Sequence, residues 1–129
     1  YSVTAIEDDE LGKDGDTTPF IPDTTCDSGT CAFDDVTGSD WETATNNGFG
    51  YSIDNNDASS VPFQYNTAGN FDALPFATDA DSNSPVEIMS SSGVADDQDI
   101  YMCYRISVGA TQEAGDYENI VTYTATATF

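Results

Sequence analysis

The sequence predicts an all-β protein, folded as a single antiparallel Greek-key β-sandwich of seven to eight strands. Three observations indicate this fold class. Short runs in which apolar and polar residues alternate recur along the chain, turn-forming Gly, Pro, Asn and Asp residues separate these runs, and no run has the spacing of an amphipathic helix. The length of 129 residues suits one domain.

The first six residues form the first expected strand, because Tyr1, Val3 and Ala5 alternate with polar residues. The ten residues that follow hold six acidic side chains, which indicate a solvated linker rather than a core element. We therefore divide the chain into an N-terminal strand with its acidic linker, residues 1–16, and a β-sandwich domain, residues 17–129.

Several shorter strands are expected in the middle of the chain. Phe49, Tyr51 and Ile53 alternate with small residues, which is typical of a strand with one buried face. The pair Phe20–Ile21 lies between two prolines and can only occupy a sheet edge. The other expected strands here cover residues 31–36, 61–65, 71–76 and 86–89.

The last third of the chain has the clearest strand pattern. The apolar face of the first run consists of Ile100, Met102, Tyr104, Ile106 and Val108, and that of the second run of Val121, Tyr123, Ala125, Ala127 and Phe129. Turn-rich residues 109–116 separate the two runs. Such alternation predicts two half-buried antiparallel strands.

The charge balance excludes whole classes of partner. The chain has 24 acidic residues against Lys13 and Arg105, no His, and a net charge of −22. Nucleic acid is excluded as a partner because no basic patch exists, and no apolar run is long enough to insert in a membrane. Self-repulsion of this size must be offset by salt, divalent cations or a cationic surface. Arg105 is expected to pair with an acid on a neighbouring strand.

We expect no enzymatic activity and no required cofactor, because a chain without His cannot form the usual hydrolytic triad. Calcium is the one candidate ligand. Asp79, Asp81 and Asn83 place three oxygen-bearing side chains at alternate positions of one loop. The motif is incomplete, since Ser84 and Ser90 stand where a calcium-binding helix–loop–helix motif requires Gly and Glu.

Cys26 and Cys31, with four residues between them, predict a small disulfide loop formed in an oxidising compartment. A second pairing stays open. Tyr101 precedes Cys103 by two residues, a spacing that resembles the tyrosine corner of immunoglobulin-like sandwiches. Trp41 lies where such folds place their core tryptophan, so this resemblance implies a bridge from Cys31 to Cys103.

The end of the chain also resembles a known group. Residues 86–129, with Ala114 to Tyr117 reading Ala-Gly-Asp-Tyr before a Thr- and Tyr-rich final strand, are similar to the last hairpin of secreted microbial surface β-sandwiches. These include fimbrial, pilin-like and spore-coat-like subunits. The resemblance implies structural or adhesive work without cofactor chemistry. Because the sequence begins at Tyr1 without Met, we also expect a removed export signal and an extracellular, cell-surface location.

The leading hypothesis is a structural subunit that polymerises with copies of itself into a filament or surface layer. In this hypothesis the first strand completes the sheet of a neighbouring copy, with Tyr1, Val3, Ala5 and Ile6 filling its pockets. The competing interpretation pairs this strand within its own domain. The alternative function is a monomeric adhesin or carbohydrate-binding module that binds a host surface or glycan through Trp41 or Tyr51.

Overall fold

The computed structural model describes residues 1–13, 18–65 and 70–128, and it shows an all-β protein built from several small antiparallel sheets. Its one described 3₁₀ helix is η2 (Asp79–Asp81). The strands are β1 (Ser2–Glu7), β2 (Leu11–Lys13), β3 (Phe20–Ile21), β4 (Ser39–Asp40), β5 (Gly48–Asn55), β6 (Asp72–Ala73), β7 (Val86–Ser90), β8 (Ile100–Ser107), β9 (Tyr117–Glu118) and β10 (Val121–Thr126).

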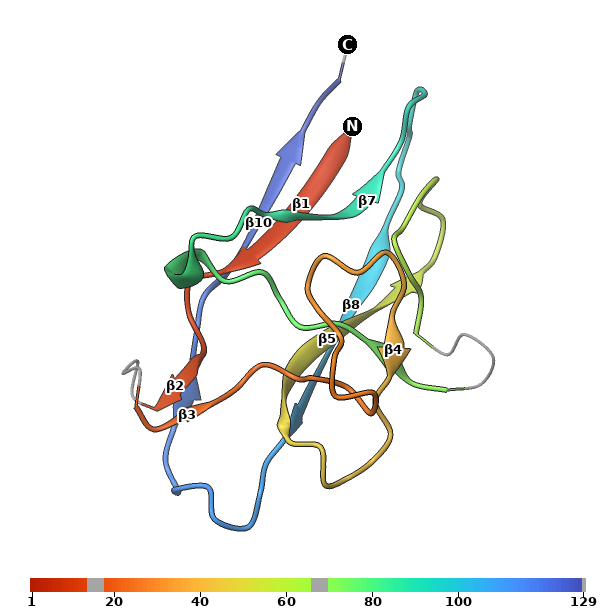
Figure 1. Ribbon diagram of the computed structural model, residues 1–129. Helices are drawn as coiled ribbons and strands as arrows, with labels where there is room; N and C mark the ends of the chain where they lie inside the picture. The colour runs from red at the N-terminus through yellow and green to blue at the C-terminus, as the bar shows by residue number, and fades with distance from the viewer. Residues whose placement is uncertain (14–17, 66–69, 129) are drawn as a thin grey trace.

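Strand β1 is the middle strand of a three-stranded sheet of order β10-β1-β7 (Figure 1). Its pairing with β10 runs through six residue pairs, and its pairing with β7 contains a register shift between Val3 and Thr4. The predicted alternation is confirmed here, because Ala5 and Glu7 are buried whereas Ser2 and Thr4 are partly exposed. A second sheet, of order β3-β2-β9, lies beyond the end of the first.

Strands β5 and β8 form the longest ladder, with eight opposed residue pairs. The other edge of β5 is also occupied: Tyr51 and Leu74 exchange two backbone hydrogen bonds of 2.9 and 3.0 Å, and the Thr24 amide donates to the Phe49 carbonyl at 2.7 Å. Gly50 allows this close approach, because a Cβ at that position would lie 2.7 Å from the Thr24 Cγ2 atom. Strand β5 is therefore enclosed on both edges.

One hydrophobic core joins the sheets. Its largest fully buried side chains are Trp41, Tyr51, Phe76, Ile53 and Leu74. The rings of Tyr51 and Phe76 stack with centroids 4.3 Å apart, and aromatic packing of this kind adds to the free energy gained by burial. Ala5 from β1 and Ile88 from β7 belong to the same cluster. The β10-β1-β7 sheet and the β5–β8 ladder thus cover a shared interior.

Two expected strands are absent. Residues 31–36 form turns that follow the disulfide loop, and residues 61–65 form no ladder, although Phe63 is buried. Conversely, β2 lies where the acidic composition predicted a solvated linker, and Leu11 joins the core. A single apolar side chain can direct a segment into the core whatever the charge of its neighbours. The domain boundary drawn at residue 16 lies outside the described residues.

The local disulfide is confirmed, since Cys26 and Cys31 are bonded with a Cα–Cα distance of 5.8 Å. The alternative bridge from Cys31 to Cys103 is wrong, and Cys103 is a half-exposed free thiol. Tyr101, proposed for a tyrosine corner, is 59% exposed. Within the described part of the chain, no helix has the length and apolar character needed to cross a membrane.

Candidate functional site

The slot that holds β1 is the first candidate site, because it contains the predicted donor residues. Val3 packs partly buried against the core and Ala5 is 2% exposed, so both face inward. The Tyr1 hydroxyl donates to the Gln98 side-chain oxygen at 2.6 Å. Ile6 is only partly buried, and in the alternating pattern its side chain lies on the opposite face from Ala5.

Glu7, the last residue of β1, takes the inward position that follows Ala5, and its side chain is fully buried. Its carboxylate accepts hydrogen bonds from the Asn119 side-chain amide at 2.7 Å and from the Thr78 hydroxyl at 3.2 Å. It also shares a side-chain hydrogen bond with Asp23. These contacts connect β1 to three other segments of the chain. They form a buried polar cluster that the analysis of the sequence missed.

Burial determines the protonation of this cluster. Desolvation, together with the neighbouring Asp23, raises the pKa of Glu7 to about 9. Desolvation also raises the pKa of Asp23 to about 7, although its hydrogen bond with Glu7 opposes the shift. Burial likewise raises the pKa of the nearby Glu10 carboxyl. Two buried carboxyl groups that share a hydrogen bond are more stable with one proton between them than with both groups negatively charged.

A polar pocket of about 230 Å³ lies beside this cluster, where the chain leaves β1. Its lining residues are Asp8, Asp9, Glu118, Asn119 and Ile120. The Asp8 amide donates to the Ile120 carbonyl at 3.0 Å, and an Asp8 carboxylate oxygen accepts from the Ile120 amide at 2.8 Å. The segment after β1 is therefore fastened to the start of β10 by two hydrogen bonds.

The three candidate calcium ligands lie in and just after η2. Asp79 and Asp81 are exposed, and Asn83 is half-buried. Asn83 donates its backbone amide to the Thr78 carbonyl at 3.3 Å. Among the described residues, no group of three or more His, Cys, Asp or Glu side chains is arranged to hold a metal ion. Calcium binding by Asp79, Asp81 and Asn83 stays a prediction.

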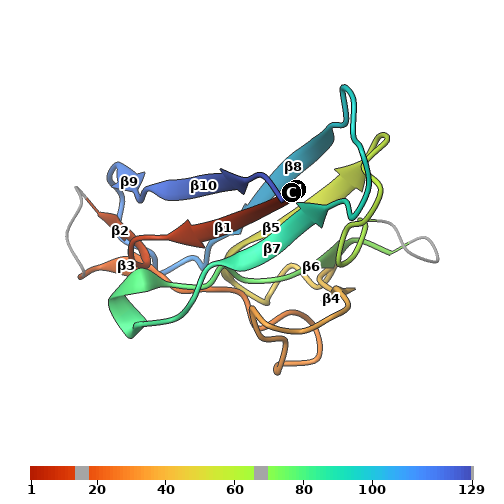
Figure 2. The ribbon, with the colours of Figure 1, turned by 90° about the horizontal axis from the view of Figure 1, so that it is seen from above.

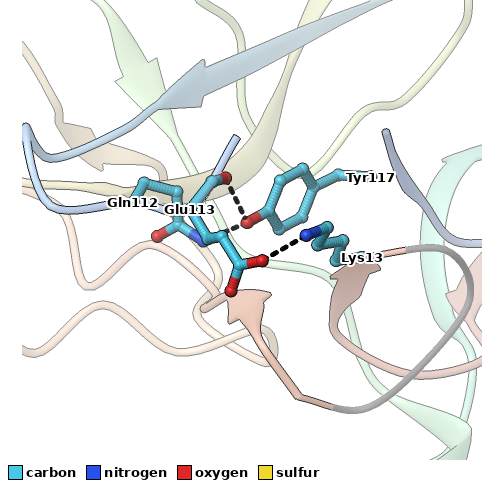
Figure 3. A network of polar contacts seen from close by, with 4 residues as sticks. All are labelled: Lys13, Gln112, Glu113 and Tyr117. Carbon is cyan, nitrogen blue, oxygen red and sulfur yellow. Dashed lines mark hydrogen bonds and ion pairs between the residues drawn. The ribbon is translucent and has the colours of Figure 1, made fainter. Parts of the chain in front are cut away.

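Lys13 takes part in a polar network that fixes the loop between β8 and β9 (Figure 3). Its ammonium group forms an ion pair with Glu113. The Tyr117 hydroxyl donates to the Glu113 carbonyl at 2.7 Å and accepts from the Gln112 side chain at 2.8 Å. Gln112 also contacts the Phe20 carbonyl at 3.2 Å, so the network links β2, β3 and β9.

The aromatic residues expected to bind sugar are not at the surface. Trp41 is 0% and Tyr51 2% exposed, so the predicted carbohydrate platform on these two rings is wrong. The guanidinium of Arg105 lies over the Trp41 ring, 4.7 Å from its centroid, and donates to the Trp41 carbonyl. Among the described residues no acid forms an ion pair with Arg105, so in that part of the chain its partner is the Trp41 ring and not the acid expected from the sequence.

In comparisons with known proteins, no family model, no curated protein and no solved structure matches this chain. The likeness of its C-terminal residues to secreted surface sandwiches therefore rests on the sequence pattern alone.

Proposed function

We propose that this chain is an extracellular structural subunit that polymerises into a filament or surface layer by exchanging β1 between copies. We also propose that its sheets together make a single Greek-key β-sandwich. The observation that carries the proposal is the position of β1, which fills a slot between β7 and β10, two strands that are far from it in the sequence. The same slot in a second copy offers identical partners.

The contacts of β1 explain why exchange would cost little. Strand β1 supplies main-chain hydrogen bonds on both of its edges, and it buries Ala5 and Glu7. A strand from another copy would make the same contacts, so the free energy of the occupied slot would not change. A slot emptied of β1 would expose the edges of β7 and β10, which favours refilling.

The connection after β1 would be the hinge. It consists of Asp8, Asp9 and Glu10, before the chain enters β2. A short connection that folds back in one copy can extend and carry its strand to another copy. An exchange from each copy to the next does not close on itself, so it produces open fibres rather than dimers.

Cysteine crosslinking between two singly substituted chains tests this proposal. Thr4 and Thr124 lie directly opposite each other on β1 and β10, at a separation that a disulfide can span. Thr4→Cys and Thr124→Cys would be made separately in a Cys103→Ser background, mixed in equal amounts, and oxidised. Exchange of β1 predicts a disulfide-linked heterodimer on a non-reducing gel, and the doubly substituted chain should form covalent ladders.

In the matched control, the Thr4→Cys chain is mixed with an Asp40→Cys chain in place of the Thr124→Cys chain. Asp40 is an exposed position on β4. This mixture should form no more heterodimer than random collision produces. If the Thr4→Cys and Thr124→Cys chains also give only that background at every concentration, β1 stays within its own domain. That result would favour the monomeric adhesin or carbohydrate-binding module instead.

A further inference from the structure

The side of the molecule along β8 and β10 exposes a row of apolar side chains to solvent. We call it the β8–β10 side and define it by Tyr104, Ile106, Val108 and Tyr123. Their exposed fractions are 50%, 55%, 54% and 42%. Tyr104 is part of the interior packing, because its ring stacks on Phe49 with centroids 6.1 Å apart. The row is therefore a continuation of the core that the molecule itself leaves uncovered.

Strands β8 and β10 run along the same side of the molecule, as Figure 2 shows. The hydroxyl groups of Tyr104 and Tyr123 contact each other and join the two strands. Among the described strands, β8 pairs only with β5, and β10 pairs only with β1. Each therefore has one edge without a strand partner, and such edges are common points of association between chains.

The distribution of charge indicates what covers this side. Residues 100–112 contain no acidic residue, and residues 119–129 contain no charged residue at all. All 24 acidic residues lie elsewhere in the chain, whose net charge is −22. Two copies approaching through acidic surfaces would repel each other strongly, whereas the strands of the β8–β10 side belong to stretches of sequence that carry no acidic residue. A cationic partner would be drawn to the acidic faces instead.

We propose that the β8–β10 side is an interface at which a second copy of this chain docks, burying the exposed row of each copy against the other. This contact is separate from β1 exchange and goes beyond it. Exchange would connect copies end to end, whereas the β8–β10 side would join them laterally. Large exposed apolar patches on soluble proteins commonly mark such interaction sites, and a contact of this kind between identical patches has twofold symmetry.

The test measures self-association after β1 exchange has been blocked. The monomeric, internally crosslinked form of the Thr4→Cys, Thr124→Cys, Cys103→Ser chain would be purified, since its β1 cannot leave. Sedimentation equilibrium would be recorded over a range of concentrations in 0.15 M and 2 M NaCl. We expect a monomer–dimer equilibrium that tightens at the higher salt concentration, because salt screens the repulsion between the copies.

Ile106→Asp in this locked chain should weaken the dimer at least tenfold, because it places a charge in the proposed interface. Val94→Asp is the matched control, since Val94 is a fully exposed apolar residue outside the β8–β10 side. The locked chain with Val94→Asp should dimerise as tightly as the locked chain without it. Val108→Asp serves as a second variant if Ile106→Asp disturbs folding, which circular dichroism would reveal.

Two results would overturn the proposal. One is a locked chain that stays monomeric at both salt concentrations. The other is a folded Ile106→Asp or Val108→Asp variant that dimerises as tightly as Val94→Asp. Either result would leave β1 exchange untouched, because that exchange is measured in the unlocked, mixed chains.

Discussion

Strands β5 and β8 are partners in one ladder, yet their inward faces have opposite environments. Phe49, Tyr51 and Ile53 on β5 are between 0% and 5% exposed. Ile106 and Tyr104 on β8, the direct partners of Phe49 and Tyr51, are 55% and 50% exposed, whereas Met102, the partner of Ile53, is partly buried against the core. Both strands show the same alternation of apolar and polar residues. The difference teaches that alternation predicts which side chains share a face, whereas burial depends on what covers that face.

The reason for the difference is the number of neighbours. Strand β5 has β8 on one edge and Leu74 with Thr24 on the other, and aromatic rings pack on its inward face. Strand β8 has β5 on one edge, and no other described strand pairs with it. A residue near an unpaired edge loses cover on one side, so water reaches its side chain.

The largest test of this contrast substitutes the same residue type on the two strands. Ile53→Ala should reduce the free energy of unfolding by about 2–5 kcal/mol, because it removes fully buried atoms and leaves a cavity. Ile106→Ala should cost less than about 1 kcal/mol, since half of the side chain already contacts water. Urea unfolding of both variants at low protein concentration measures the difference. Equal losses would mean that the β8 row is covered in solution.

The cysteines give a second test, because they also divide between a buried and an open environment. The Cys26–Cys31 disulfide lies in the core beside β5, whereas Cys103 is a half-exposed thiol on β8. Replacing both Cys26 and Cys31 with Ser should cost about 2 kcal/mol of unfolding free energy. Cys103→Ser should change it by less than about 0.5 kcal/mol. A larger loss from Cys103→Ser would show that the Cys103 side chain is packed more closely than its partial exposure indicates.

A third, smaller effect concerns the end of β1, where a buried position is occupied by an acid. The pKa of Glu7 is raised above its unfolded value, so the folded state binds its proton more tightly than the unfolded state does. The stability gained is fully present below the unfolded pKa, and it is lost as the pH rises toward about 9. We expect the wild type to lose about 1 kcal/mol between pH 6 and pH 7, relative to Glu7→Gln.

Thermal or urea unfolding of both proteins across this pH range checks the sign. The groups that face Glu7 are Asp23, Thr78, Asn119 and Glu10. Because Asp23 shares a hydrogen bond with Glu7, the difference between the two proteins measures the titration of the Glu7–Asp23 pair. A wild type that gains stability relative to Glu7→Gln on raising the pH would show that the carboxylate is charged and well solvated in the folded state.

Much of the fold could be predicted from particular residues. The alternation at Tyr1, Val3 and Ala5 predicted β1, and that at Phe49, Tyr51 and Ile53 predicted β5. Four intervening residues favoured the Cys26–Cys31 disulfide over the bridge to Cys103, because so short a loop brings the thiols within reach. The alternation of Val3 and Ala5, continued by two residues, would also have predicted that the Glu7 side chain points into the core. The acidic composition of its neighbours hid that signal.

Other features depended on contacts between distant segments. The position of β1 between β7 and β10, the stacking of Arg105 on Trp41, and the meeting of Glu7 with Asp23 each join residues that the sequence separates. Local pattern carries no information on such pairs, since many arrangements of the same strands satisfy it. The burial of Trp41 likewise follows from packing, although the resemblance to immunoglobulin-like sandwiches had implied a core tryptophan there.

The sequence by itself determined that the chain forms strands, which residues share a face, and that its net charge is −22, and it favoured the local disulfide. These properties follow from backbone periodicity, short loop length and ionisable groups, all of which are local. Only the tertiary structure decided that β5 is enclosed, that the row on β8 is open, and that a carboxylic acid is buried at the end of β1. Burial depends on every neighbouring segment at once, so no stretch of sequence specifies it alone.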